Sequence, residues 1–120
     1  MKNGLGKFVM KLILGGAVIM LMGYLFEGVY VKDYTVAFLV AFVLSLLNTF
    51  VKPVLTVIAF PITFMTLGLF QLVINGFVLN LAVDVLSPDF QIQSFSLTIL
   101  CSIFISIFYS ILGLNKDDDD

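Results

Sequence analysis

The sequence predicts an all-α membrane protein with four transmembrane helices in a single domain, residues 1–114. Hydrophobic residues make up 61% of the chain and charged residues only 12%, whereas soluble domains hold roughly 45–50% and about 25%. The apolar residues also fall into stretches close to the length of about 20 residues that a helix needs to cross a bilayer. With so few charged residues, this chain could not cover its apolar surface in a water-soluble fold of 120 residues.

The first predicted span covers about residues 8–26, and three lysines, Lys2, Lys7 and Lys11, precede it or lie near its start. This arrangement resembles a secretory signal. No small-x-small cleavage site follows it, because the chain continues Phe26-Glu27-Gly28-Val29-Tyr30. We therefore expect the stretch to be retained as a transmembrane helix.

The second and fourth spans are expected at about residues 34–51 and 94–114. A short polar connection with Glu27, Lys32 and Asp33 precedes the second span. The turn signal Ser87-Pro88-Asp89 precedes the fourth span.

Between them, residues 54–86 form a nearly continuous apolar stretch of 33 residues. A single helix of that length would measure about 50 Å, whereas the hydrocarbon core is roughly 30 Å thick. We therefore expect residues 63–83 to cross the membrane. Segment 53–61, bounded by Pro53 and Pro61, is expected to be a short interfacial or re-entrant helix. The alternative is one long tilted helix with a kink.

The lysines predict the orientation. With four crossings, Lys32 falls on one side, and the other five fall on the opposite side: Lys2, Lys7, Lys11, Lys52 and Lys116. Cytoplasmic segments carry the excess of positive charge, so both chain ends are predicted to lie inside. The acidic tail 115–120 resembles part of a common affinity tag and is left out of the fold prediction.

Two spans carry small residues at intervals of four, which places them on one helix face. The residues are Ala37, Ala41 and Ser45 in the second span, and Thr98, Ser102, Ser106 and Ser110 in the fourth. Small residues allow close helix packing, within the chain or between copies of it. Together with the amides Gln71, Asn75 and Asn80 of the third span, they are also compatible with a polar path. Both interpretations stay open.

Several functions are disfavoured by composition. The chain has no histidine and a single cysteine, Cys101, which excludes ordinary zinc sites and histidine-dependent nucleophilic triads. We therefore expect no catalytic residues, metal or cofactor. The absence of arginine and of a basic stripe argues against nucleic acid. A proton-coupled carrier generally needs an ionisable group at mid-membrane, and none of the predicted spans has a carboxylate there.

One block of sequence is more specific. The order Leu47-Asn48, Lys52-Pro53, Pro61, Thr66-Leu67-Gly68-Leu69-Phe70 and Ile74-Asn75 resembles the phage holin family 4 (superfamily IV), or YvlD-like, group of small four-span bacterial membrane proteins. Lys52 stands where the group more often has arginine. The resemblance implies a multi-pass protein of the bacterial cytoplasmic (inner) membrane. It links some members to envelope stress and supports a lytic role only weakly.

The sequence therefore predicts a non-enzymatic inner-membrane protein that forms homo-oligomers and serves envelope integrity or stress. Its expected partners are the lipid bilayer, further copies of itself and other membrane proteins. The alternative is a holin-like or solute-selective pore on the polar faces of spans three and four. The candidate structural or pore-lining residues are Asn48, Pro53, Pro61, Thr66, Gly68, Gln71, Asn75 and Asn80.

Overall fold

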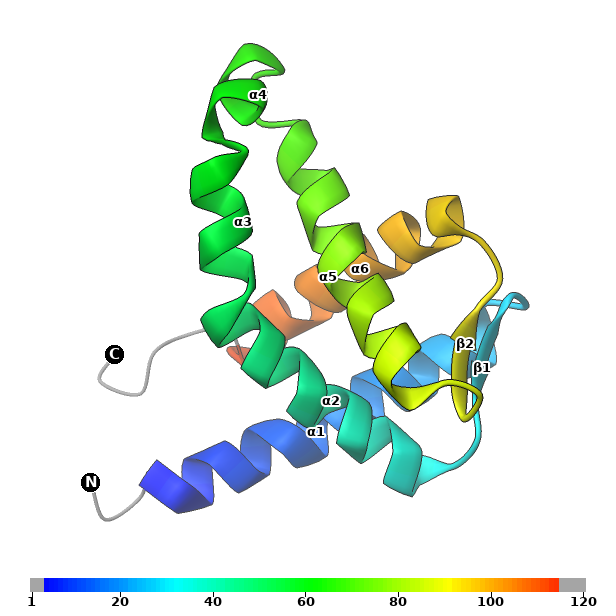
Figure 1. The fold of residues 1–120 in the computed structure, drawn as a ribbon. Helices are drawn as coiled ribbons and strands as arrows, with labels where there is room; N and C mark the ends of the chain where they lie inside the picture. The colour runs from blue at the N-terminus through cyan, green and yellow to red at the C-terminus, as the bar shows by residue number, and fades with distance from the viewer. Residues whose placement is uncertain (1–3, 115–120) are drawn as a thin grey trace.

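A computed structural model describes residues 4–114. Six helices and two short strands follow one another along the chain (Figure 1). They are α1 (Gly4–Leu25), β1 (Val29–Val31), α2 (Tyr34–Phe50), α3 (Lys52–Ile58), α4 (Phe60–Met65), α5 (Phe70–Leu86), β2 (Phe90–Ile92) and α6 (Phe95–Leu112).

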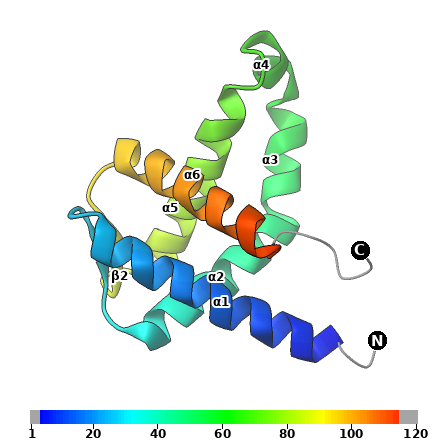
Figure 2. The same cartoon turned by 180° about the vertical axis from the view of Figure 1, so that it is seen from behind.

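The four longest helices form a bundle of two layers, with α2 and α5 on one side and α1 and α6 on the other (Figures 1 and 2). Within it α1 packs against α2, α2 against α5, and α5 against α6, and α1 also touches α6. Every one of these helices therefore has two neighbours.

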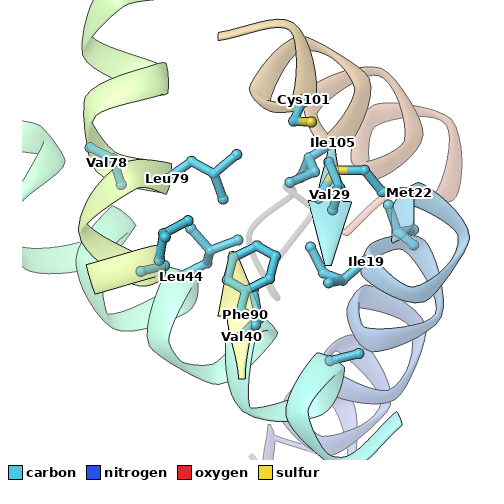
Figure 3. Packing of buried hydrophobic residues seen from close by; sticks show 14 of the residues in the cluster. Ile19, Met22, Val29, Val40, Leu44, Val78, Leu79, Phe90, Cys101 and Ile105 are labelled. Atoms are coloured by element: carbon cyan, nitrogen blue, oxygen red, sulfur yellow. The ribbon is translucent and has the colours of Figure 1, made fainter. Parts of the chain in front are cut away.

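The bundle encloses an apolar core. Ile19 and Met22 of α1, Val40 of α2 and Leu79 of α5 are all fully or almost fully buried. Figure 3 shows these side chains pointing toward one another around Phe90 of β2. This core lies between the two ends of the bundle, and the buried polar side chains among residues 4–114 are Thr98 and Ser102 of α6.

Side-chain caps determine where two of the helices begin. The Asp33 carboxylate accepts a hydrogen bond from the Val36 amide at 3.0 Å, and the Ser94 hydroxyl accepts one from the Leu97 amide at 3.2 Å. Each cap satisfies a backbone donor that has no partner within the helix. The two caps lie at the same end of the bundle, beside the strands.

The strands close that end. β1 and β2 pair antiparallel, with Tyr30 opposite Gln91, and thereby join the α1–α2 and α5–α6 connections. Phe90 on β2 is fully buried and packs into the core. The sequence pattern does not predict these strands. We call this end of the molecule the strand end.

Beyond α2 the chain leaves the bundle as a helical hairpin. The axis bends by 41° between α2 and α3, and α3, α4 and the first half of α5 then project away from the other helices (Figure 1). Pro53 lies in the first turn of α3 and Pro61 in the first turn of α4, where a missing amide hydrogen costs nothing. We call this segment, residues 53–74, the apolar hairpin.

The Thr66–Leu69 turn reverses the chain at the hairpin tip. Leu67 and Gly68 have positive φ values of 57° and 93°, and glycine adopts such a conformation without strain. The Thr66 hydroxyl donates to the Ile62 carbonyl at 3.0 Å and accepts from the Phe70 amide at 3.1 Å. The TLGLF sequence therefore ends α4 and starts α5.

Two helices, α1 and α6, are long and apolar enough to cross a membrane, and a bent α2–α3 pair qualifies as a third, by length and composition within residues 4–114. The helix α5 has 17 residues, or about 26 Å. It begins at Phe70, whereas the sequence predicted a span from residue 63. The difference arises because the Thr66–Leu69 turn takes Gly68 out of the helix.

Candidate functional site

A polar cavity lies at the end of the bundle opposite the strands, where α1 begins and α6 ends. It consists of two adjoining hollows of 140 and 460 Å³, which share Asn48, Lys52 and Tyr109. The smaller hollow reaches between α2, α5 and α6, and the larger lies between α1 and α2. Because both Lys11 and Lys52 line it, we call this the lysine end.

The local structure explains why these side chains meet. Asn48 lies in the last turn of α2, and the bend after it turns Lys52 at the start of α3 toward the same space. Asn75 comes from the middle of α5. From α6, Ser102 and Ser106 line the smaller hollow at an interval of four, and Tyr109 follows one turn later.

The charge in this cavity is positive. Among residues 4–114, no acidic side chain lines either hollow. Lys52, at the start of α3, is half-buried and lines both hollows. A negatively charged partner would stabilise the ammonium ion there, so the cavity is suited to an anion.

The polar atoms of the cavity are only partly satisfied. The Asn75 side-chain oxygen is buried and has no hydrogen-bond partner. A buried amide oxygen without a partner costs free energy, and Asn75 lines the smaller hollow together with the Ser106 and Tyr109 side chains. The Asn75 amide is therefore in position to bond to a molecule within the cavity.

Apolar side chains also line the smaller hollow. At its inner wall it meets Val78, Leu79 and Ile105, which belong to the apolar core. A separate hollow at the strand end is lined by Glu27, Gln91 and other residues of the two connections. The apolar core therefore separates the two polar regions of the protomer.

The residues singled out from the sequence fall into three groups in the structure. Asn48, Asn75, Ser102 and Ser106 line the smaller hollow, and Ser45 lines the larger one. Pro53, Pro61, Thr66 and Gly68 belong to the apolar hairpin. Gln71 and Asn80 of α5 are half-buried and line neither hollow.

The small-residue faces are used largely inside the protomer. Ala37 and Ala41 are buried, and a Cβ atom on Gly15 of α1 would lie only 3.1 Å from the Ala41 Cβ. Thr98 and Ser102 are also buried, whereas Ser106 and Ser110 are exposed. Any contact between protomers through the α6 stripe is therefore restricted to its last two members.

Sequence reasoning did not assign Lys52 and Tyr109 to a site. The sequence does not indicate that two of the lysines meet, although Lys11 and Lys52 share a cavity in the structure. For Tyr109 a signal existed, because it lies three residues after Ser106 and so on nearly the same helix face. Among the described residues, no group of three metal-binding side chains occurs.

Comparison with known proteins identifies the family. Residues 6–111 match the family described as the mycobacterial four-span phage holin, superfamily IV. The chain is 26% identical to the uncharacterized membrane protein YvlD of Bacillus subtilis over 106 residues, covering 88% of this chain and 89% of that protein. It is 37% identical to the uncharacterized protein SCO3922 of Streptomyces coelicolor over 84 residues, covering 68% and 67%.

No solved structure matches the chain. The predicted resemblance is confirmed by the match over residues 6–111, and so is the assignment to a multi-pass protein of the bacterial inner membrane. The chain belongs to the phage holin superfamily IV family of four-span membrane proteins.

Proposed function

We propose that this chain is a non-enzymatic inner-membrane protein that forms oligomers, serves envelope integrity or stress, and contains no conduit of its own within the protomer. The observation that carries the proposal is the apolar core between the two polar ends. Phe90, Met22 and Leu79 are fully or almost fully buried there. An ion crossing this layer would lose its hydration and find only the Thr98 and Ser102 hydroxyls as polar partners, which is costly.

The proposed topology has α1, α2, α5 and α6 as the four spans, with the lysine end in the cytoplasm. Their 22, 17, 17 and 18 residues correspond to about 33, 26, 26 and 27 Å, near the thickness of the hydrocarbon core. The positive-inside rule supports this orientation, because Lys11 and Lys52 share one end and Lys32 lies at the other.

The apolar hairpin fits into the same arrangement as a membrane-embedded segment. Leu67, Met65 and Phe64 at its tip are 93%, 80% and 71% exposed, and no charged residue occurs between Lys52 and Asp84. An exposed apolar surface of this kind is unfavourable in water and marks contact with lipid or another protein. We place the hairpin in the bilayer, on the side of the lysine end.

Labelling tests the topology. A cysteine at position 3 or 115 should react with a membrane-impermeant maleimide only from the cytoplasmic side, and one at position 30 only from outside. The background variant Cys101→Ala removes the native thiol, which is buried. Labelling of position 30 from the cytoplasm would contradict the proposed topology.

The function is tested by release of ions and dyes of graded size from liposomes that contain the purified protein. Liposomes that stay tight, with the protein shown to be folded and inserted, support a role that does not involve conduction. Release with a defined size limit would contradict it. The second candidate would then be favoured, namely a pore between protomers.

One observation favours that second candidate over a pore within the chain. Ser106 lines the polar cavity and is also an exposed residue of α6. A neighbouring protomer at this face would extend the polar surface. In that case Asn75→Leu should abolish release while the protein stays folded and oligomeric, and unchanged release would exclude the cavity as part of the path.

A further inference from the structure

The cavity at the lysine end adjoins a second, purely apolar feature. A groove of 260 Å³ runs between α3 and α5 and is lined by Leu55, Ile58, Ala59, Phe70, Val73, Ile74 and Phe77. Leu55 lies one helical turn after Lys52, and Ile74 directly precedes Asn75. The groove therefore begins beside the polar cavity and continues along the apolar hairpin.

We propose that the cavity and the groove together bind one anionic phospholipid, with its phosphate at Lys52 and an acyl chain between α3 and α5. The combination of a cationic polar pocket and an adjoining apolar groove matches the two parts of a lipid molecule. Basic pockets between transmembrane helices on the cytoplasmic side are suited to anionic headgroups. The inference rests on the proposed topology, which puts Lys52 at the depth of the headgroups.

The cavity offers the donors that a phosphate needs. A phosphodiester has only acceptor oxygens, and Lys52, Asn48, Asn75, Ser106 and Tyr109 each supply a donor from a side chain that lines the smaller hollow. The Lys52 ammonium group would form the charge-assisted bond, which is the strongest of the set. No acidic side chain among the described residues lines the hollow to compete for it.

The buried Asn75 oxygen adds a second requirement. It is an acceptor without a partner in the protein, so it needs a donor from the bound molecule or from water. The glycerol headgroup of phosphatidylglycerol carries hydroxyl groups beside its phosphate and can supply one. Phosphatidylcholine has neither a net negative charge nor a hydroxyl in its headgroup, and it is the matched comparison lipid.

The test measures lipid binding to the full-length protein in detergent by native mass spectrometry, titrating phosphatidylglycerol or phosphatidylcholine. Lys52→Gln should weaken phosphatidylglycerol binding by about fivefold, the effect expected for one lysine near a lipid headgroup. Lys52→Arg should retain the affinity. Lys32→Gln is the control, because Lys32 is an exposed lysine at the strand end, and it should change nothing.

The groove is tested separately. Ala59→Leu places a larger side chain in the groove and should weaken both lipids, because both carry acyl chains. Val73→Phe serves the same purpose should Ala59→Leu fail to fold, as judged by helical circular dichroism and a single elution peak. Equal weakening of both lipids by a groove variant, together with a headgroup effect confined to phosphatidylglycerol, supports the proposal.

Three results would overturn it. The first is Lys32→Gln weakening phosphatidylglycerol as much as Lys52→Gln, which would indicate general charge attraction. The second is inorganic phosphate displacing the lipid while groove variants have no effect, which would indicate a site for free phosphate. The third is a Lys52→Gln effect on phosphatidylglycerol binding that disappears when Asp117–Asp120 are changed to asparagine. That result would make the acidic tail the partner of Lys52.

The outcomes for the lipid site and for the proposed function are independent. Tight liposomes without lipid selectivity would leave the proposed function in place and remove the lipid site. Release of solutes from liposomes, with the selectivity for phosphatidylglycerol intact, would contradict the proposed function and leave the lipid site in place.

Discussion

The close contact between α5 and α6 gives the sharpest quantitative prediction. A Cβ atom on Gly76 would lie 2.6 Å from the Ile99 Cγ1 atom and 3.2 Å from its Cα atom, whereas ordinary contacts begin at 3.4 Å. In Gly76→Ala the nearest contact is therefore too short by 0.8 Å, and isoleucine is too stiff to move aside freely. Overpacking costs about 1–3 kcal/mol and replacing a helical glycine recovers about 0.5–1, so the expected net destabilisation is about 1 kcal/mol.

The measurement is the free energy of unfolding, from helical circular dichroism during titration with SDS in mixed micelles. Gly6→Ala in α1 is the matched control, because nothing lies within 4 Å of the added Cβ. It should leave the stability unchanged or raise it. Ile99→Ala removes the Cγ1 atom, so the double variant Gly76→Ala/Ile99→Ala should be more stable than the sum of the two single effects predicts.

A coupling energy within about 0.5 kcal/mol of zero would show that the two residues do not meet. So would a Gly76→Ala protein as stable as Gly6→Ala. Either result would contradict the packing of α5 on α6, and with it the position of Asn75 in the polar cavity.

Two further variants test other parts of the structure. Phe90→Ala should lower the free energy of unfolding by about 3–5 kcal/mol, because the side chain is fully buried. Tyr30→Ala on the paired strand should lower it by about 0.5 kcal/mol, because Tyr30 is 52% exposed. Equal effects of the two variants would contradict the packing of Phe90 into the core at the strand end. In a Cys101→Ala background, Ser110→Cys should form disulfide cross-links between protomers in native membranes. Thr98→Cys should not, because Thr98 is buried. If both variants remain monomeric, oligomers do not form through this face of α6.

Much of the helical architecture was accessible from the sequence because it depends on local patterns. Hydropathy located the apolar stretches, and Pro53 and Pro61 indicated a break, since proline is tolerated in a first helical turn and not in a helix interior. Both prolines do start short helices. The interval of four placed Thr98 and Ser102 on one face, and both are buried.

The strands were not predictable in the same way. Each has only three residues, which is too short for an alternating pattern to be recognised. Their pairing joins residues such as Tyr30 and Gln91, which are far apart in the sequence, so no local pattern indicates it. The start of α5 at Phe70 depends similarly on the backbone of the Thr66–Leu69 turn.

The site was predictable in part. The family resemblance singles out Asn48 and Asn75, and Asn75 is also an amide within an apolar span, where an amide without a partner is unfavourable. Both line the smaller hollow. Their meeting with Lys52 depends on the 41° bend between α2 and α3. A sequence indicates that a proline breaks a helix, but the direction of the bend follows from tertiary packing.

The arrangement of polar residues constrains any transport role more strongly than their number does. In the protomer the polar cavity ends at Val78 and Leu79, and the polar groups of the strand end lie beyond the apolar core. On the proposed function a conducting path would pass outside the bundle, and Ser106 and Ser110 are exposed along α6. Such a path would require at least two protomers, so release from liposomes should rise more steeply than linearly with protein density. A linear dependence would instead require the core to open within one chain.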